Sequence, residues 1–228
     1  MRCLRPGAGQ GLRDRIGFFG GTFDPVHNGH LRLAENALTE CGLRQVVFIP
    51  AATPPHKSLE NLTPFSQRVE MLNEALQGRQ EFVCSTVEAE LPAPTYTVDT
   101  LRYLRKRYAP DTGLFFLTGL DAFLEITTWR EYRELLRLAS FIVSERDGEH
   151  YARQKNKLAD LIGYFPQGRI WFGKDGAQPV FFLAGLPLAL SSSMIRQRVR
   201  QNVSIRGMVP DGVYRYIEKY QIYRMKDA

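Results

Sequence analysis

The stretch Gly20-Gly21-Thr22-Phe23-Asp24-Pro25-Val26-His27-Asn28-Gly29-His30 lies between a short apolar run and an amphipathic segment. The apolar run, Ile16 to Phe19, predicts a buried strand, and the apolar spacing from Leu31 to Leu38 predicts a helix. We therefore predict a strand-to-helix loop at the carboxyl end of a strand, which is where open α/β sheets bind their ligands.

The residue types of this loop predict an anion-binding site. Gly20 and Gly21 carry no side chain, so backbone N–H groups can come close to a ligand. Gly29 precedes a helix N-terminus, whose unpaired N–H groups carry partial positive charge. His27 and His30 are three residues apart, which places both imidazoles on one side of the first helical turn, where they can donate to phosphate. A Gly-rich turn with two exposed histidines explains the parts separately but not their combination.

The same stretch resembles the signature of the nucleotidyltransferase superfamily with the H-x-G-H motif, and it is most similar to that of bacterial nicotinate-nucleotide adenylyltransferases. The resemblance implies transfer of an adenylyl group from ATP to nicotinate mononucleotide, giving nicotinate adenine dinucleotide and pyrophosphate in NAD biosynthesis. It implies Mg²⁺ on the ATP phosphates, with no metal ligands from the protein. Within this stretch we expect ATP contacts from six residues, namely Gly20, Gly21, Thr22, Phe23, His27 and His30.

Length and composition predict one α/β domain that binds a small anion. The chain has 228 residues, 44% of them hydrophobic and 24% charged, and its longest apolar run is too short to span a bilayer. The net charge of +6 fits anionic ligands, but the basic residues are spread over several helices, so we expect nucleotides and neither nucleic acid nor membrane. A P-loop and a G-x-G-x-x-G fingerprint are both missing from the sequence.

The ends of the chain and its cysteines add three expectations. Residues 1–15 are rich in Arg and Gly without an apolar segment, which indicates a disordered or non-native extension before a domain at 16–223 and a tail at 224–228. Cys3, Cys41 and Cys84 form no C-x-x-C pair, which favours reduced thiols in the cytoplasm. We expect a monomer or a homodimer.

Strands and helices alternate along the chain. This alternation predicts a Rossmann-like, doubly wound, mainly parallel sheet in a single domain with a C-terminal helical part. The charged, Gly-rich segment 147–178 fits a helix and loops. The predicted strands are 45–50, 82–88, 114–118 and 141–144, and the predicted helices are 63–76 with Thr63 as N-cap, 97–108 with Thr97 as N-cap, 130–138, 191–199 and 210–220.

Lys57 ends the segment Ala52-Thr53-Pro54-Pro55-His56-Lys57, which follows the second predicted strand. The two prolines favour an extended backbone that can hold Lys57 towards phosphate. A stiff connector with a solvated lysine explains the residues equally well. The family carries this element at the same place, and by that resemblance Lys57 contacts the phosphates of both nucleotides.

Five further residues are assigned to ligands by the resemblance. Tyr96 and Thr97 stand at a predicted helix N-terminus and would bind the pyridine mononucleotide, with Thr97 and nearby N–H groups receiving its ring carboxylate. Gly119 allows close approach, and Asp121 can accept from adenosine. Trp129 would stack on the pyridine ring, although packing at a helix start also explains a tryptophan there.

The segment Leu190-Ser191-Ser192-Ser193-Met194-Ile195-Arg196 predicts a second anion-binding helix N-terminus. By resemblance Ser191, Ser192, Ser193 and Arg196 bind ATP, and the family usually has threonine where Ser193 stands. We expect His27, His30, Lys57 and Arg196 to steady the triphosphate and the charge that develops on pyrophosphate.

Other functions stay open at this point. The chain could instead prefer nicotinamide mononucleotide, or be another H-x-G-H nucleotidyltransferase acting on pantetheine phosphate or a cytidylyl acceptor. A class I aminoacyl-tRNA synthetase would need a K-M-S-K-S element, which is missing. A nucleotide sensor or nucleic-acid-binding protein without catalysis is the alternative from outside enzymes.

Overall fold

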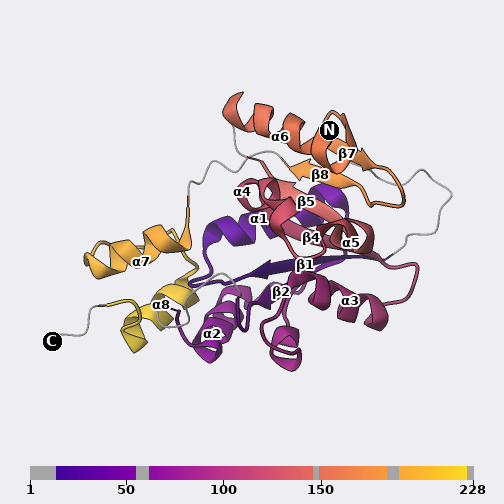
Figure 1. Cartoon of the computed structure of the whole chain (residues 1–228). Helices are drawn as coiled ribbons and strands as arrows, with labels where there is room; N and C mark the ends of the chain where they lie inside the picture. Colours follow the sequence, from indigo (N-terminus) through magenta and orange to yellow (C-terminus); the bar gives the residue numbers. More distant parts are fainter. Residues whose placement is uncertain (1–13, 55–61, 146–148, 184–189, 225–228) are drawn as a thin grey trace.

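The computed structural model describes residues 14–54, 62–145, 149–183 and 190–224, and shows one sheet with strand order β3-β2-β1-β4-β5-β8-β7-β6 (Figure 1). Neighbouring strands from β3 to β8 in this order pair in parallel, while β7 pairs antiparallel with both β8 and β6. The predicted Rossmann-like, mainly parallel fold is confirmed. The strands are β1 (Arg15–Gly21), β2 (Gln45–Pro50), β3 (Phe82–Cys84), β4 (Gly113–Gly119), β5 (Ser140–Ser144), β6 (Tyr164–Gln167), β7 (Ile170–Gly173) and β8 (Val180–Leu183).

Helices cover both faces of the sheet, because the central strands are apolar on both sides. In β1, Ile16 and Phe18 pack on one face and Phe19 packs on the other. α1, α2, α7 and α8 contribute to the Phe19 side, whereas α3, α4, α5 and α6 contribute to the Ile16 side. The helices are α1 (Asn28–Cys41), α2 (Phe65–Leu76), α3 (Thr97–Arg107), α4 (Leu120–Leu124), α5 (Tyr132–Leu138), α6 (Glu149–Ile162), α7 (Ser192–Arg200) and α8 (Asp211–Tyr220).

The strand order reverses between β1 and β4. The chain proceeds from β1 outwards to β2 and β3, and then returns to β4 on the other side of β1. In an open parallel sheet this reversal leaves a crevice at the carboxyl ends of the two strands, where ligands bind. The loop after β1 therefore lies at the place that the topology makes available.

The C-terminal helical part lies beside this end of the sheet. In Figure 1, α7 and α8 are at the left of the molecule with α2, far from α6 and β7. The side chains of Tyr216 on α8 and Glu70 on α2 are hydrogen-bonded, and Ile217 is fully buried. Helix α8 begins after Pro210, as the sequence predicts.

Two predicted boundaries near the site are wrong. β1 continues through Gly20 and Gly21, which pair with Ile49 and Pro50, so these glycines end a strand and do not belong to a loop. β3 ends at Cys84 and a 3₁₀ turn, Val87–Glu90, replaces the rest of the predicted strand. Among the described strands β3 pairs only with β2, at the edge of the sheet. Beyond Cys84 the chain leaves this edge, and the Glu88 side chain accepts a hydrogen bond from Thr100 on α3.

Two predicted N-caps also move by one residue. α2 is capped by Pro64, and not by Thr63, because the carbonyl of Pro64 accepts the first bond of the helix, from the N–H of Arg68 at 3.1 Å. α3 is capped by the extended Tyr96, so Thr97 is its first residue. The predicted helix at 130–138 begins only at Tyr132.

The segment 147–178 holds more regular structure than its composition indicates. It contains the whole of α6 and a hairpin of β6 and β7, joined through Gly168 at φ 61°. A tight turn at positive φ is favourable for glycine. Trp171 on β7 is 1% exposed and closes the core on the α6 side.

Candidate active site at the carboxyl end of strand β1

His27 and His30 form a stacked pair at the N-terminus of α1. His27 is the extended N-cap residue and His30 lies in the first turn, so their rings come to 3.6 Å between centroids at 23°. The backbone N–H of His27 donates to Nδ1 of His30 over 3.2 Å. Because Nδ1 of His30 is an acceptor there, the neutral ring carries its proton on Nε2, which leaves Nε2–H as a fixed donor.

Gly29 makes room for the His27 ring. A Cβ atom at Gly29 would lie 3.0 Å from Nδ1 and 3.1 Å from Cε1 of His27. These distances are shorter than ordinary van der Waals contact, so a side chain there would push the imidazole by a few tenths of an ångström. Ring packing thus favours the glycine between the two histidines, in addition to backbone access.

Both histidines are neutral near pH 7 in the free protein. Burial lowers the pKa of His27 to about 4. Burial also lowers the pKa of His30 well below its ordinary value, and repulsion from His27 adds to this effect. The pair therefore offers hydrogen-bond donors to an incoming phosphate, and a positive charge on either ring has to be induced by that phosphate.

Helix α7 is fastened to the loop that precedes the histidines. Ser191 caps α7 by accepting from the N–H of Met194 at 3.2 Å. The hydroxyl of Ser192 donates to the carbonyl of Pro25 at 2.9 Å, and Nη1 of Arg196 donates to the carbonyl of Asp24 at 2.7 Å. The structure thus brings Ser192 and Arg196 to the loop between β1 and α1, residues 22–27, which we call the histidine loop. They are separated from it by about 170 positions.

A buried polar cluster of Asp24, Thr63, Arg68 and Tyr223 holds the backbone of the histidine loop, and no sequence pattern predicts it. Arg68 on α2 is 1% exposed and donates to the carbonyls of Thr22 and Thr63 at 2.8 and 2.9 Å. Asp24 is 2% exposed and accepts from the hydroxyl of Tyr223 at 2.6 Å and from the N–H of Thr63 at 3.4 Å. Burial and the Asp24 carboxylate raise the pKa of Tyr223, which keeps its hydroxyl a donor.

A pocket of about 290 Å³ opens between β1, the segment after β2 and the N-terminus of α3. Its lining includes Gly20, Gly21 and Thr22 together with Thr97 and Trp129. The indole of Trp129 stands edge-on to Phe116, 6.1 Å between centroids. The structure thus brings Tyr96, Thr97 and Trp129 together at one pocket, and the stretch Gly20 to Thr22 links this pocket to Phe19 and Phe23, whose rings contact His30.

Glu88 is a further residue of this pocket that the sequence analysis does not identify. Its two carboxylate oxygens accept from the hydroxyl of Thr100 at 3.1 Å and the N–H of Ala52 at 3.4 Å. It therefore joins α3 to the segment that follows β2. Burial raises the pKa of Glu88 from 4.5 to about 6, against the opposing effects of these hydrogen bonds and of Arg68.

The raised pKa of Glu88 predicts a pH dependence of stability. Between pH 4.5 and 6 the folded protein keeps a proton on Glu88 that the unfolded chain has lost, so this contribution to stability falls as pH rises. The unfolding free energy of the wild type, minus that of Glu88→Gln, should fall by up to about 2 kcal/mol from pH 4 to 7. Urea titrations at each pH measure the two unfolding free energies, and taking their difference removes the pH dependence that the histidines contribute to both proteins. A constant difference over this range would contradict the raised pKa.

Five predicted site residues lie apart from the pocket and the histidine pair, are turned away from ligands, or cannot be placed. Lys57 is outside the described residues. The Phe23 side chain is 2% exposed in the core, so only its backbone can face a ligand. Gly119 ends β4 with open space around its Cα, whereas Asp121 lines a separate hollow of about 530 Å³ between α4 and α6. Ser193 is exposed, with its hydroxyl 3.3 Å from that of Ser191.

Neither a metal cage nor a membrane span is found in the part of the chain that the structure describes. Within it, no three His, Cys, Asp or Glu side chains come together in a way that could hold an ion. Its helices are all too short or too polar to cross a bilayer.

The sequence matches a family of nucleotidyltransferases, and the fold matches a solved structure. The cytidylyltransferase-like family model matches residues 18–198, which include the histidine loop and most of α7. A solved structure, nicotinic acid mononucleotide adenylyltransferase of Plasmodium falciparum complexed with NaAD, shares the fold with a TM-score of 0.70 at 19% identity, over 92% of this chain and 98% of that one.

Two curated bacterial relatives identify the family. Each is named a probable nicotinate-nucleotide adenylyltransferase. The protein from Desulfotalea psychrophila is 40% identical over 92% of this chain and 99% of its own length. The protein from Citrifermentans bemidjiense is 41% identical over 92% and 98%. The chain belongs to the nicotinate-nucleotide adenylyltransferase family.

Proposed function

We infer that this chain transfers the adenylyl group of ATP to nicotinate mononucleotide, giving nicotinate adenine dinucleotide and pyrophosphate in NAD biosynthesis. One observation carries the inference. The pocket that holds Trp129 is lined by Gly20, Gly21 and Thr22, and the rings of the two residues on either side of this stretch, Phe19 and Phe23, contact His30 of the stacked histidine pair. A nucleotide in the pocket and one at the histidines would therefore meet near this stretch. Relatives that are 40% identical over almost their full length support the assignment.

The proposed reaction is a direct displacement. A phosphate oxygen of the mononucleotide attacks the α-phosphorus of ATP, the bond from that phosphorus to the bridging oxygen breaks, and pyrophosphate leaves. No proton has to be removed from the attacking group, because a phosphate monoester with a second pKa of about 6 is largely ionised at pH 7. Catalysis then consists of alignment and electrostatic stabilisation, without a covalent enzyme intermediate.

The phosphate side is assigned to the donors around α1 and α7. His27 and His30 donate to the triphosphate, and they become more basic when its charge arrives. Further donors lie at the same loop. They are the guanidinium of Arg196 and the N-terminus of α7 with Ser191 to Ser193. Lys57 keeps its proposed phosphate role from the resemblance alone, as do the adenosine contacts of Gly119 and Asp121.

The mononucleotide side is assigned to the pocket. Trp129 presents a half-buried indole for stacking on the pyridine ring. Thr97 and the first N–H groups of α3 point donors at the ring substituent, because these groups have no partner within the helix. A carboxylate accepts from such donors, whereas the NH₂ of a carboxamide faces them as another donor.

Mg²⁺ is proposed to enter bound to ATP. The carboxylate of Asp24 in the histidine loop is buried and accepts from Tyr223 and Thr63. The other side chains that meet there are imidazoles, hydroxyls and a guanidinium, which suit phosphate oxygens better than a divalent cation. The residues described here therefore do not fit a resident ion. The triphosphate oxygens would hold the metal, whose charge would offset that of the phosphates.

The test is pyrophosphate release with ATP and Mg²⁺, comparing nicotinate and nicotinamide mononucleotides at equal concentration. We expect release with the acid and at least about tenfold less with the amide, since a neutral amide loses a charge-assisted hydrogen bond. Equal or reversed use would overturn the carboxylate pocket while keeping adenylyl transfer. Absence of release with either compound would overturn the proposed function.

The cellular setting is part of the same proposal. Cys84 is a free thiol, which fits a reducing cytoplasm. Burial raises the pKa of Cys84 to about 11, so it is a weak nucleophile. We propose a monomer or homodimer that acts on small molecules without nucleic acid or membrane partners.

A further inference from the structure

The charged side chains in the described lining of the Trp129 pocket are one basic and one acidic group, Arg130 and Glu88. Arg130 lies over the ring of Tyr96, with its Cζ 4.8 Å from the centroid. Glu88 is bound instead to Thr100 and Ala52. A ligand with a negative ring substituent would therefore turn that substituent towards Arg130 and away from Glu88.

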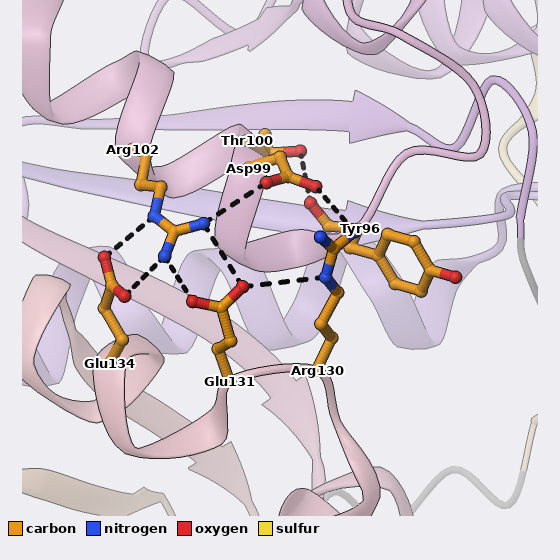
Figure 2. A network of polar contacts seen from close by, with 7 residues as sticks. All are labelled: Tyr96, Asp99, Thr100, Arg102, Arg130, Glu131 and Glu134. Carbon is orange, nitrogen blue, oxygen red and sulfur yellow. Dashed lines mark hydrogen bonds and ion pairs between the residues drawn. The ribbon is translucent and has the colours of Figure 1, made fainter.

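Arg130 is held in place without using up its donors. Figure 2 shows it between two carboxylates, Asp99 at 3.7 Å from Nη1 and Glu131 at 3.6 Å from Nε. Both distances exceed hydrogen-bond length and 52% of the Arg130 side chain is exposed, so these contacts orient the guanidinium by charge without bonding to its N–H groups. No hydrogen bond is found from the Arg130 side chain to the described residues, which leaves its N–H groups for a ligand.

A second arginine, Arg102, forms hydrogen bonds with the same two carboxylates, Asp99 and Glu131. Arg102 donates to Asp99 at 3.4 Å and also binds Glu131 and Glu134 (Figure 2). Asp99 and Glu131 are thus shared between the two arginines and do not neutralise Arg130 alone. Glu131 has the left-handed backbone of φ 51°, which orients this residue between the pocket and α5.

The position of Arg130 relates it to one part of the acceptor. Its neighbours Tyr96 and Asp99 flank Thr97, where the ring substituent is assigned above. His27 and His30 do not belong to the described lining of this pocket, so the phosphates are assigned elsewhere. The guanidinium therefore faces the ring end of the pocket.

We propose that Arg130 is a specificity-determining residue, whose guanidinium pairs with the carboxylate of the acceptor's pyridine ring and so selects the acid over the amide. The inference rests on the proposed function and deepens it. A guanidinium presents parallel N–H groups that match both oxygens of a carboxylate. A carboxamide offers one oxygen and turns two N–H groups towards the cation.

The experiment compares Arg130→Gln with Arg133→Gln. Both remove one positive charge, but Arg133 is exposed on α5 and is outside the described pocket lining. For Arg130→Gln we expect kcat/KM for nicotinate mononucleotide to fall about 10- to 100-fold, and that for the nicotinamide compound to stay within about threefold. Arg133→Gln should change neither by more than about twofold. Pyrophosphate release measures all rates.

A second variant separates charge from a general disturbance of the pocket. Arg130→Lys keeps the charge and should retain clearly more of the acid-to-amide ratio than Arg130→Gln. Equal losses for both substrates in Arg130→Gln, or identical ratios in the two variants, would overturn the inference while wild-type activity upholds the proposed function. Failure of the proposed function is a separate result, because the wild type would then release no pyrophosphate with either compound.

Discussion

His30→Ala is expected to lower kcat for adenylyl transfer by about 10²- to 10³-fold, the usual cost of losing one aligned donor to a developing negative charge. The structure supports a large effect because the ring cannot reorient freely. Its Nδ1 accepts from His27, and its faces and edges meet His27, Phe19 and Phe23 at 3.6, 5.7 and 5.1 Å between centroids. The measurement is pyrophosphate release at saturating ATP and mononucleotide.

Arg32→Ala is the matched control for this prediction. Arg32 lies on the exposed side of α1 with 58% of its side chain exposed, and its one described ion pair is to Glu35 at 3.9 Å. Its replacement should leave kcat within about twofold, as expected of an exposed ion pair. Near-normal turnover of His30→Ala under the same conditions would show that the histidine has no catalytic role.

Arg68→Met is expected to lower the free energy of unfolding by about 3–5 kcal/mol, the range for breaking one side of a buried charged contact. The substitution leaves the carbonyls of Thr22 and Thr63 without their buried donor and removes the cation that faces Asp24. Urea unfolding measures the change. Activity should fall as well, because Thr22 lines the pocket that holds Trp129.

Arg44→Met provides the comparison. Arg44 has 63% of its side chain exposed and pairs with Asp14 at 3.3 Å, so its replacement should change the unfolding free energy by no more than about 0.5 kcal/mol. A loss below about 1 kcal/mol in Arg68→Met would mean that water replaces the guanidinium, and that the cluster under the loop contributes little to stability.

The sequence predicts the parts of the site that lie close together along the chain. The β1 strand, His27 and His30 are within one strand, loop and helix, so spacing alone places both rings on one side of α1. The prediction fails where a contact joins distant positions. Arg68 bonds to Thr22 across 46 positions, and no local pattern distinguishes it from a solvated arginine on α2.

Glu88 and the β6–β7 hairpin show two other reasons for failure. Glu88 follows an apolar run, so it resembles the polar end of a strand, and its inward turn depends on Thr100 and Ala52. The hairpin strands have four residues each, and they expose Phe165 and Phe172 by 49% and 40%. Such short, weakly alternating strands give little periodic signal, and Pro166 further argues against a strand.

The bond from Tyr223 to Asp24 joins positions 199 apart and so concerns how the protein is made. During synthesis Asp24 emerges from the ribosome long before Tyr223, whose hydroxyl donates to it. Until Tyr223 arrives, the Asp24 carboxylate has to stay hydrated, which keeps the loop open. The nucleotide-binding loop would thus reach its final shape only after the segment that follows α8 has been made, however early β1 and α1 form.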